Sequence, residues 1–279
     1  MSNRKKVVLI VIFGSLLSGA VSSVTKIGLV QIPPFGFSFV RFLIASIFLL
    51  PWFIKSKTKI DKSFMSLLLI SVLPVINIAV FVLGVRTTTA SIGQMLYAGS
   101  PILVGLISYF LLKNRLSFAR WLLIFTGLMG VVLVIILPLL DKKSLFTGDL
   151  KGNLLISVGV ILYSFYMVLS KQFQKKYSPI IITSVFFFLS TIVFFFLSIL
   201  EIQKGNLWYY SLQASSIYAV LYVAIFATVI AYVLGQYTIK YSTPTIASLA
   251  FYLQPIFAYL SAFILLGERL TPGLISLTK

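Results

Sequence analysis

The sequence predicts an all-α membrane protein, a polytopic bundle of spanning helices, and three observations support this expectation. The 279 residues are 59% hydrophobic and only 10% charged, with a mean hydropathy of +1.08, whereas soluble domains carry about a quarter charged residues. The apolar residues fall in runs of about 20, the length that a helix needs to cross the hydrocarbon layer. These runs lack the alternation, in segments of about ten residues, that builds a membrane barrel. Because lipid offers no partners for unpaired backbone groups, we expect the runs to be helices.

Nine runs qualify as spans, and only short loops remain between them. The first run follows the basic residues Arg4 to Lys6, as in a signal peptide, but it is long and eight further spans follow. We therefore expect an uncleaved first helix. In chain order the spans are Val7–Thr25, Phe35–Ile54, Phe64–Val85, Thr88–Leu112, Trp121–Leu140, Asn153–Ser170, Ile180–Leu200, Ser215–Tyr237 and Ser242–Leu266.

The distribution of basic residues predicts the orientation. With the N-terminus inside, the inner loops hold 14 Lys and Arg residues and the outer loops hold 6. Cytoplasmic loops carry the excess of basic residues in membrane proteins, so we expect a cytoplasmic N-terminus. The same distribution accounts for the net charge of +18 without a nucleic-acid partner.

The composition argues against an enzyme. The chain has no Cys, no His and five carboxylates. Membrane enzymes need clusters of acids, bases, nucleophiles or metal ligands. The five carboxylates are instead scattered, and we expect no catalytic residue, no metal site and no cofactor. They are Asp61, Asp141, Asp149, Glu201 and Glu268.

Self-comparison of the sequence indicates an internal duplication. A shift of 154 residues superposes the fourth span on the ninth, and a shift of 145 superposes the first on the sixth. The matched pairs include Thr89 with Thr243, Tyr97 with Phe251, Pro101 with Pro255, Arg115 with Arg269, Gly14 with Gly159, Lys26 with Lys171 and Pro34 with Pro179. We therefore expect two five-helix repeats, 1–140 and 141–279. Because five is an odd number of spans, the repeats are inverted, an arrangement on which alternating access is often built. The alternative is that the duplication is only a relic of folding.

The repeat also predicts a tenth helix, because the span Trp121–Leu140 follows the fourth span of the first half. After Leu270 only residues 271–279 remain, and these are too few to cross a bilayer. We expect the second repeat to be truncated after its fourth helix. A protein of nine helices is the alternative.

Several motifs together point to a known family. They are the two repeats, a first span that runs from Gly14 to Lys26, Arg41 six residues into the second span, and the turn LLGERLTP at Leu265–Pro272. The whole chain resembles the drug/metabolite transporter superfamily, in its EamA-type branch. The resemblance implies ten helices around a central cavity, export or exchange of small metabolites, often amino acids, and a location in a plasma membrane, a bacterial inner membrane in particular. The chain departs from the family pattern at residues 113–115, which lack the acidic residue of that turn, and in the missing tenth helix.

Lys26 and Arg41 are intramembrane cations near the outer ends of the first and second spans. Such residues are costly in lipid and usually face protein or water, and no carboxylate lies deep in any span to pair with them. We expect a cationic outer vestibule that attracts a carboxylate or another anion. The alternative is that both side chains snorkel to the outer interface. The missing intramembrane carboxylate also favours facilitated movement or exchange over proton coupling.

Further polar residues are spaced to face a common cavity; for example, Thr228, Tyr232 and Gln236 recur at every fourth position. The alternative for each residue is a hydrogen bond between helices. By contrast, we expect Phe186–Phe188 and Phe194–Phe196 to face lipid. The residues expected to line the substrate pathway are Ser22, Lys26, Arg41, Asn77, Gln94, Tyr97, Tyr163, Tyr166, Tyr232, Gln236, Tyr252 and Gln254.

The function predicted from these features is secondary transport of small metabolites across the plasma membrane by alternating access. Amino acids or organic anions are the expected substrates and export is the expected direction. The expected partners are a small-molecule substrate, the lipid bilayer and a second copy in a homodimer. A structural or regulatory membrane protein that has lost transport is the first alternative, and a membrane-embedded enzyme is the second.

Overall fold

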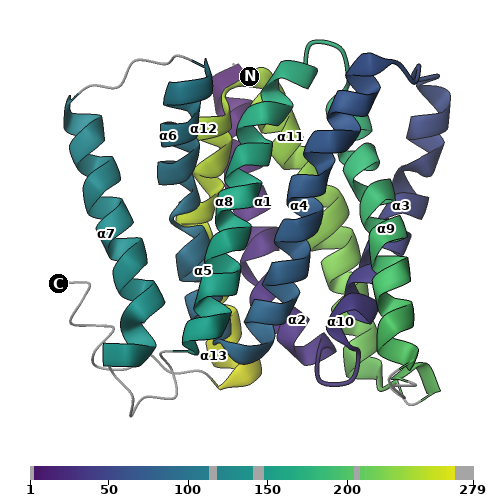
Figure 1. Cartoon of the computed structure of the whole chain (residues 1–279), viewed down its shortest axis with the longest axis vertical. Helices are drawn as coiled ribbons and strands as arrows, with labels where there is room; N and C mark the ends of the chain where they lie inside the picture. The colour runs from purple at the N-terminus through teal and green to yellow at the C-terminus, as the bar shows by residue number, and fades with distance from the viewer. Residues whose placement is uncertain (1–2, 113–117, 141–147, 204–207, 211, 268–279) are drawn as a thin grey trace.

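The computed structural model describes residues 3–112, 118–140, 148–203, 208–210 and 212–267. Within these residues every element is a helix, and the helices lie side by side in a single bundle (Figure 1). Eight helical stretches are long and apolar enough to cross a membrane, and a shorter apolar stretch, Ile124–Ile136, lies within α7 (Phe118–Leu140). The all-α polytopic fold expected from the sequence is therefore confirmed.

Some spans are continuous helices and others are interrupted. The continuous ones, besides α7, are α3 (Pro34–Lys55), α4 (Lys62–Thr87), α8 (Leu150–Phe173) and α9 (Pro179–Gln203). The interrupted ones are α1 (Asn3–Gly19) with α2 (Val21–Gly28), α5 (Ala90–Tyr97) with α6 (Ser100–Leu112), α10 (Ala214–Ala224) with the π-helix η2 (Ile225–Ile230) and α11 (Ala231–Tyr241), and α12 (Pro244–Ser248) with α13 (Ala250–Leu266). A single 3₁₀ turn, η1 (Trp208–Tyr210), precedes α10.

Side chains cap the N-termini of several helices in a way that follows the internal repeat. The Thr89 hydroxyl accepts from the backbone N–H of Ile92 at the start of α5, and the Thr243 hydroxyl accepts from that of Ile246 at the start of α12, each at 3.2 Å. A threonine at this position satisfies a backbone donor that the first helical turn leaves free. Thr89 and Thr243 are the pair that the 154-residue shift superposes, so the two halves begin these helices alike.

The helices alternate in direction across the bundle (Figure 1). The face that holds the start of α1 is called the N-terminal face here, and the other is the opposite face. Loops from both halves meet on the N-terminal face, because Lys176 after α8 pairs with Asp61 before α4. The helix α8 runs from the opposite face to the N-terminal face, antiparallel to α1, as an inverted repeat requires. The division into repeats 1–140 and 141–279 stays a prediction.

The two most extensive helix pairs, α4 with α8 and α3 with α9, each join the first half of the chain to the second. At the crossing of α4 and α8 the backbones approach closely, because a Cβ added to Gly84 would lie 2.8 Å from the carbonyl oxygen of Gly152. Small residues permit such close approach of helices in lipid. This crossing holds α4 and α8 against each other, and both helices carry buried residues of the bundle interior.

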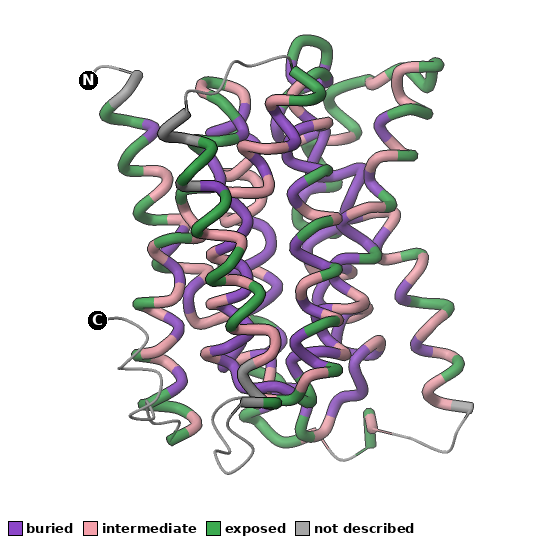
Figure 2. The backbone as a smooth tube through the Cα atoms, turned by 60° about the vertical axis from the view of Figure 1, so that its left-hand side comes forward, coloured by how far each residue is buried: buried purple, intermediate pink, exposed green. Residues whose placement is uncertain are grey.

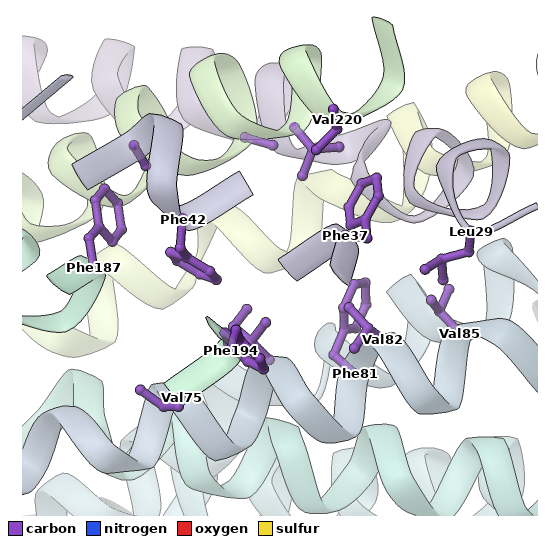
Figure 3. Close-up of a cluster of buried hydrophobic side chains, with 14 of the residues drawn as sticks. Leu29, Phe37, Phe42, Val75, Phe81, Val82, Val85, Phe187, Phe194 and Val220 are labelled. Atoms are coloured by element: carbon purple, nitrogen blue, oxygen red, sulfur yellow. The ribbon is translucent and has the colours of Figure 1, made fainter. Parts of the chain in front are cut away.

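The pairing of α3 with α9 corrects one expectation. Phe186, Phe187 and Phe194 are completely buried and pack around Phe42 of α3, with ring centroids 5.3 to 5.9 Å from that ring (Figure 3). The prediction that these residues face lipid is therefore wrong. Aromatic side chains bury the largest apolar areas, and α9 uses one side for this contact while Phe196 stays 62% exposed.

Burial across the bundle follows the arrangement expected in a membrane. Buried residues concentrate along the inner sides of the helices and exposed ones along the outer sides (Figure 2). The exposed residues of the spans include large apolar side chains such as Ile264, at 74%, and Leu69, at 73%. Lipid tails accept such surfaces without cost. The interior, by contrast, contains a set of buried polar side chains, and these define the candidate site.

Candidate functional site

The helix interruptions surround a cavity of about 110 Å³ in the interior of the bundle. Its walls come from α1 to α5 in the first half and from α8, η2, α11, α12 and α13 in the second half. Interrupted helices line ligand sites in membrane transporters because their free ends offer backbone groups to a ligand. The cavity therefore has the position and the wall structure of a substrate site.

The cavity extends toward the N-terminal face. Arg41 lies about 10 Å along α3 from the end of that helix at the opposite face, and Thr238 lies in the last turn of α11 at the N-terminal face. Both residues line the cavity. Leu29, Val82 and Val85, near the ends of α2 and α4 at the opposite face, belong to a buried apolar cluster (Figure 3).

Arg41 is the charged residue at the centre of the site. Its side chain is 2% exposed, and its Nε donates to the Thr228 hydroxyl at 2.5 Å. The guanidinium carbon lies 5.1 Å from the centroid of the Phe42 ring, and the Tyr232 hydroxyl lies within reach of the guanidinium. Nη1 has no hydrogen-bond partner, and no carboxylate of the described residues pairs with Arg41. A buried charge of this kind is costly until an anion compensates it.

Two further side-chain pairs present polar groups to the cavity. The Asn77 side-chain amide donates to the Tyr97 hydroxyl at 2.5 Å, and both residues are buried. The Gln94 amide donates to the Ser22 hydroxyl at 2.8 Å, while its Oε1 has no partner. Buried polar groups without partners are rare in proteins and call for a physical reason. A ligand that donates a hydrogen bond to Oε1 of Gln94 would supply the missing partner.

Aromatic rings complete the walls. Tyr97 lies 5.8 Å from Phe81 and 5.7 Å from Phe251, between ring centroids. Tyr163 lies 5.9 Å from Phe251 and 5.8 Å from Tyr232. All five residues line the cavity. The cavity therefore combines one cation and a few amides and hydroxyls with an extensive aromatic surface, which suits a small amphipathic anion.

The structure brings seven of the twelve predicted pathway residues to the wall of this cavity. Four others do not line it: Ser22 hydrogen-bonds to Gln94, Tyr166 is buried against Phe186, Gln236 bonds to Gln174, and Tyr252 is 47% exposed on the outside of α13. The seven that line the cavity are Arg41, Asn77, Gln94, Tyr97, Tyr163, Tyr232 and Gln254.

Lys26 is the twelfth residue, and the structure does not place it with Arg41. Lys26 lines a separate pocket at the opposite face, together with Arg86, Gln213 and Ser216. The apolar cluster around Leu29 and Val85 lies between this pocket and the central cavity. The structure therefore does not form the single cationic vestibule expected from the sequence, because Arg41 and Lys26 line separate pockets.

Several residues of the site are absent from the predicted pathway set, and Thr228 was noted only for its regular spacing with Tyr232 and Gln236. Thr238 and Phe251 line the cavity, and Thr228 holds Arg41. Phe251 could have been found from the internal repeat, because it is the counterpart of Tyr97. Thr238 gives no signal beyond its helical position. Among the residues that the structure describes, no three acidic, His or Cys side chains gather to hold a metal ion.

Comparison with known proteins gives consistent results. A model of the EamA-like transporter family matches residues 5–136 and 150–278. An uncharacterized transporter of Archaeoglobus fulgidus is 28% identical over 88% of this chain and 83% of its own length. The uncharacterized transporter YdfC of Bacillus subtilis is 26% identical over 98% of this chain and 88% of its own length.

A crystal structure of another protein is similar in fold, with a TM-score of 0.68, 16% identity, and coverage of 97% of this chain and 92% of that one. The family match covers most of both halves, and the relatives are named as transporters. The chain therefore belongs to the EamA-like transporter family and is a multi-pass membrane transporter.

Proposed function

We propose that the protein is a secondary transporter of amino acids or organic anions, and that the central cavity binds the substrate. The observation that carries this proposal is Arg41, a buried cation on the cavity wall that lacks a carboxylate partner among the described residues. A substrate anion would neutralise its charge inside the bundle. The Gln94 amide is suited to a second polar group of the substrate, and the aromatic rings are suited to its apolar part.

Transport would proceed by alternating access, with the cavity open first to one face and then to the other. The cavity extends to Thr238 near the N-terminal face, and the apolar cluster around Leu29 and Val85 closes the other direction. With the N-terminus in the cytoplasm of a bacterial cell, this state would load substrate from the cytoplasm. Export across the plasma membrane is the proposed direction, because the chain resembles a family that exports or exchanges small metabolites. The proposal leaves room for a homodimer but does not require one.

Counterflow in proteoliposomes tests the proposal directly. Vesicles loaded with an unlabelled mixture of amino acids or of organic carboxylates are diluted into the same labelled compounds, and accumulation of label is measured. We expect at least one carboxylate-bearing compound to exchange, and Arg41→Met to lower its rate by at least about tenfold because a buried charge pair is lost. Arg86→Gln is the matched control, since Arg86 is an exposed arginine outside the cavity. No exchange of any compound would refute the proposal.

The orientation and the open side can be tested by single-cysteine labelling, for which the natural chain gives no background because it has no Cys. A cysteine at Lys57 should react only from the cytoplasm, and one at Ser215 only from outside. A cysteine at Thr238 should react from the side of Lys57. Labelling of Lys57→Cys from outside would contradict the proposed orientation.

A further inference from the structure

The π-helix η2 interrupts the span formed by α10 and α11 at the level of Arg41. A π-helical turn contains one residue more than an α-helical turn, is rare, and is frequent at functional sites. The Thr228 hydroxyl lies in this segment and donates to the carbonyl of Val223, five residues earlier, at 2.6 Å. The extra residue thus sets both the direction of Thr228 and the partner of its proton.

Thr228 connects this segment to the cation. Because its hydroxyl proton is donated to Val223, the hydroxyl oxygen accepts from the Nε of Arg41, at 2.5 Å. Thr228 is completely buried and Arg41 is 2% exposed, so water does not compete for the contact. The bond joins residues 187 positions apart, one from each half of the chain.

The bond to Thr228 restricts the guanidinium, because the donors of that group have a fixed planar arrangement. With Nε held by Thr228, the Tyr232 hydroxyl bonded to the guanidinium and the guanidinium carbon placed 5.1 Å from the Phe42 ring, the direction of Nη1 is restricted. Nη1 is buried without a hydrogen-bond partner, and Arg41 lines the cavity. We propose that Thr228 is a positioning residue for the substrate anion: it holds Arg41 through the π-helical turn so that Nη1 is presented to a carboxylate. This inference rests on the proposed function and assigns a role to the hydroxyl that is separate from the charge.

The test compares two substitutions of Thr228 with a matched control. Thr228→Val removes the hydroxyl at nearly constant volume, and Thr228→Ser keeps it. Thr183→Val is the control, because Thr183 is also a buried threonine whose hydroxyl bonds to a backbone carbonyl of its own helix, and it lies outside the cavity. The probes are benzoate and its neutral isostere benzamide, titrated into the purified full chain and followed by the rise in thermal unfolding midpoint.

We expect wild type to bind benzoate more tightly than benzamide. Thr228→Val should weaken benzoate binding by about 5- to 10-fold, the effect of losing one well-placed hydrogen bond near a charge, and should leave benzamide binding unchanged. Thr228→Ser and Thr183→Val should remain within about twofold of wild type. In the Arg41→Met background, Thr228→Val should have no further effect, because the two residues act as one unit.

Several outcomes would overturn the inference. They are unchanged benzoate binding in Thr228→Val, an equal loss of benzoate and benzamide binding, failure of serine to restore binding, or an undiminished effect in the Arg41→Met background. A wild type without preference for benzoate would overturn the anion site itself. The counterflow assay separates the two proposals: if Arg41→Met stops exchange while Thr228→Val binds benzoate normally, the proposed function stands and only the positioning role fails.

Discussion

The close approach of α4 and α8 gives the sharpest prediction about stability. Gly84 lies within α4 at the crossing, and Gly84→Ala adds a single methyl group there. That Cβ would lie 2.8 Å from the carbonyl oxygen of Gly152 and 2.7 Å from Cγ1 of Ile156. Gly105, in the interior of α6, provides the matched control, because a Cβ added there meets nothing within 4 Å.

The magnitude follows from these distances. Ordinary contact begins at 3.4 Å, so at 2.8 Å the two helices must separate locally by the difference, roughly 0.6 Å. The obstacle at Gly152 is backbone, which cannot rotate away as the end of a side chain can. Overpacking of this kind costs about 1 to 3 kcal/mol, partly offset by the helix-forming advantage of alanine over glycine, about 0.5 to 1 kcal/mol. We therefore expect Gly84→Ala to destabilise the protein by about 1 to 2 kcal/mol, and Gly105→Ala to be neutral or slightly stabilising.

Thermal unfolding of the detergent-purified variants, followed by tryptophan fluorescence and by recovery of monodisperse protein after heating, measures the effect. Gly84→Ala should unfold several degrees below Gly105→Ala. Benzoate binding should fall as well, because the displaced helix carries Asn77 on the cavity wall. Equal unfolding midpoints for the two alanine variants would refute the argument that the crossing depends on glycine.

Three further predictions concern charges at the ends of helices. Lys171→Met should lower stability by about 1 to 3 kcal/mol, measured by the unfolding midpoint, because the ammonium group donates to three backbone carbonyls at and just beyond the end of α11 at 2.6, 2.7 and 3.1 Å. Glu201→Gln should lower the free energy of unfolding by about 1 kcal/mol, because the carboxylate accepts from two backbone N–H groups at the start of α3. The hydrogen bond from Lys176 and the backbone N–H at the start of α4 hold the pKa of Asp61 at about 2, below its usual 3.8. The stability that ionised Asp61 adds to the folded state is therefore present above its usual pKa of 3.8 and is lost as the pH falls through 2. The difference in unfolding midpoint between wild type and Asp61→Asn should consequently stay constant from pH 6 to 8.

The sequence predicted the helical, membrane-spanning fold because hydrophobic runs in lipid leave a chain few alternatives. Eight of the expected spans coincide with apolar helices of spanning length. The fifth contains the shorter apolar stretch within α7. Arg41 was identified as a candidate because an intramembrane cation is rare and costly, and the structure places it on the wall of the central cavity.

Other parts of the site depended on packing that no periodic pattern reveals. The regular spacing of Thr228, Tyr232 and Gln236 assumed a continuous α-helix, but η2 interrupts that helix, and Gln236 bonds to Gln174 of α8 instead of lining the cavity. Phe186 and Phe187 were expected to face lipid, but a phenylalanine side chain is equally favourable in lipid and in a protein interior. Only the partner helix α3 decides between these environments, and the sequence does not name that partner.

The hydrogen bond between Arg41 and Thr228 has a consequence for biosynthesis. Arg41 leaves the ribosome 187 residues before Thr228 does, and the main partner helices of α3 and α4 belong to the second half of the chain. A nascent first half therefore carries a guanidinium without its Thr228 partner, and helix surfaces without their partner helices, into the bilayer or the translocation machinery. Final assembly is consequently a late event that depends on delivery of α8, α9 and η2. Substitutions in the second half that prevent this assembly should therefore also lead to degradation of the first half.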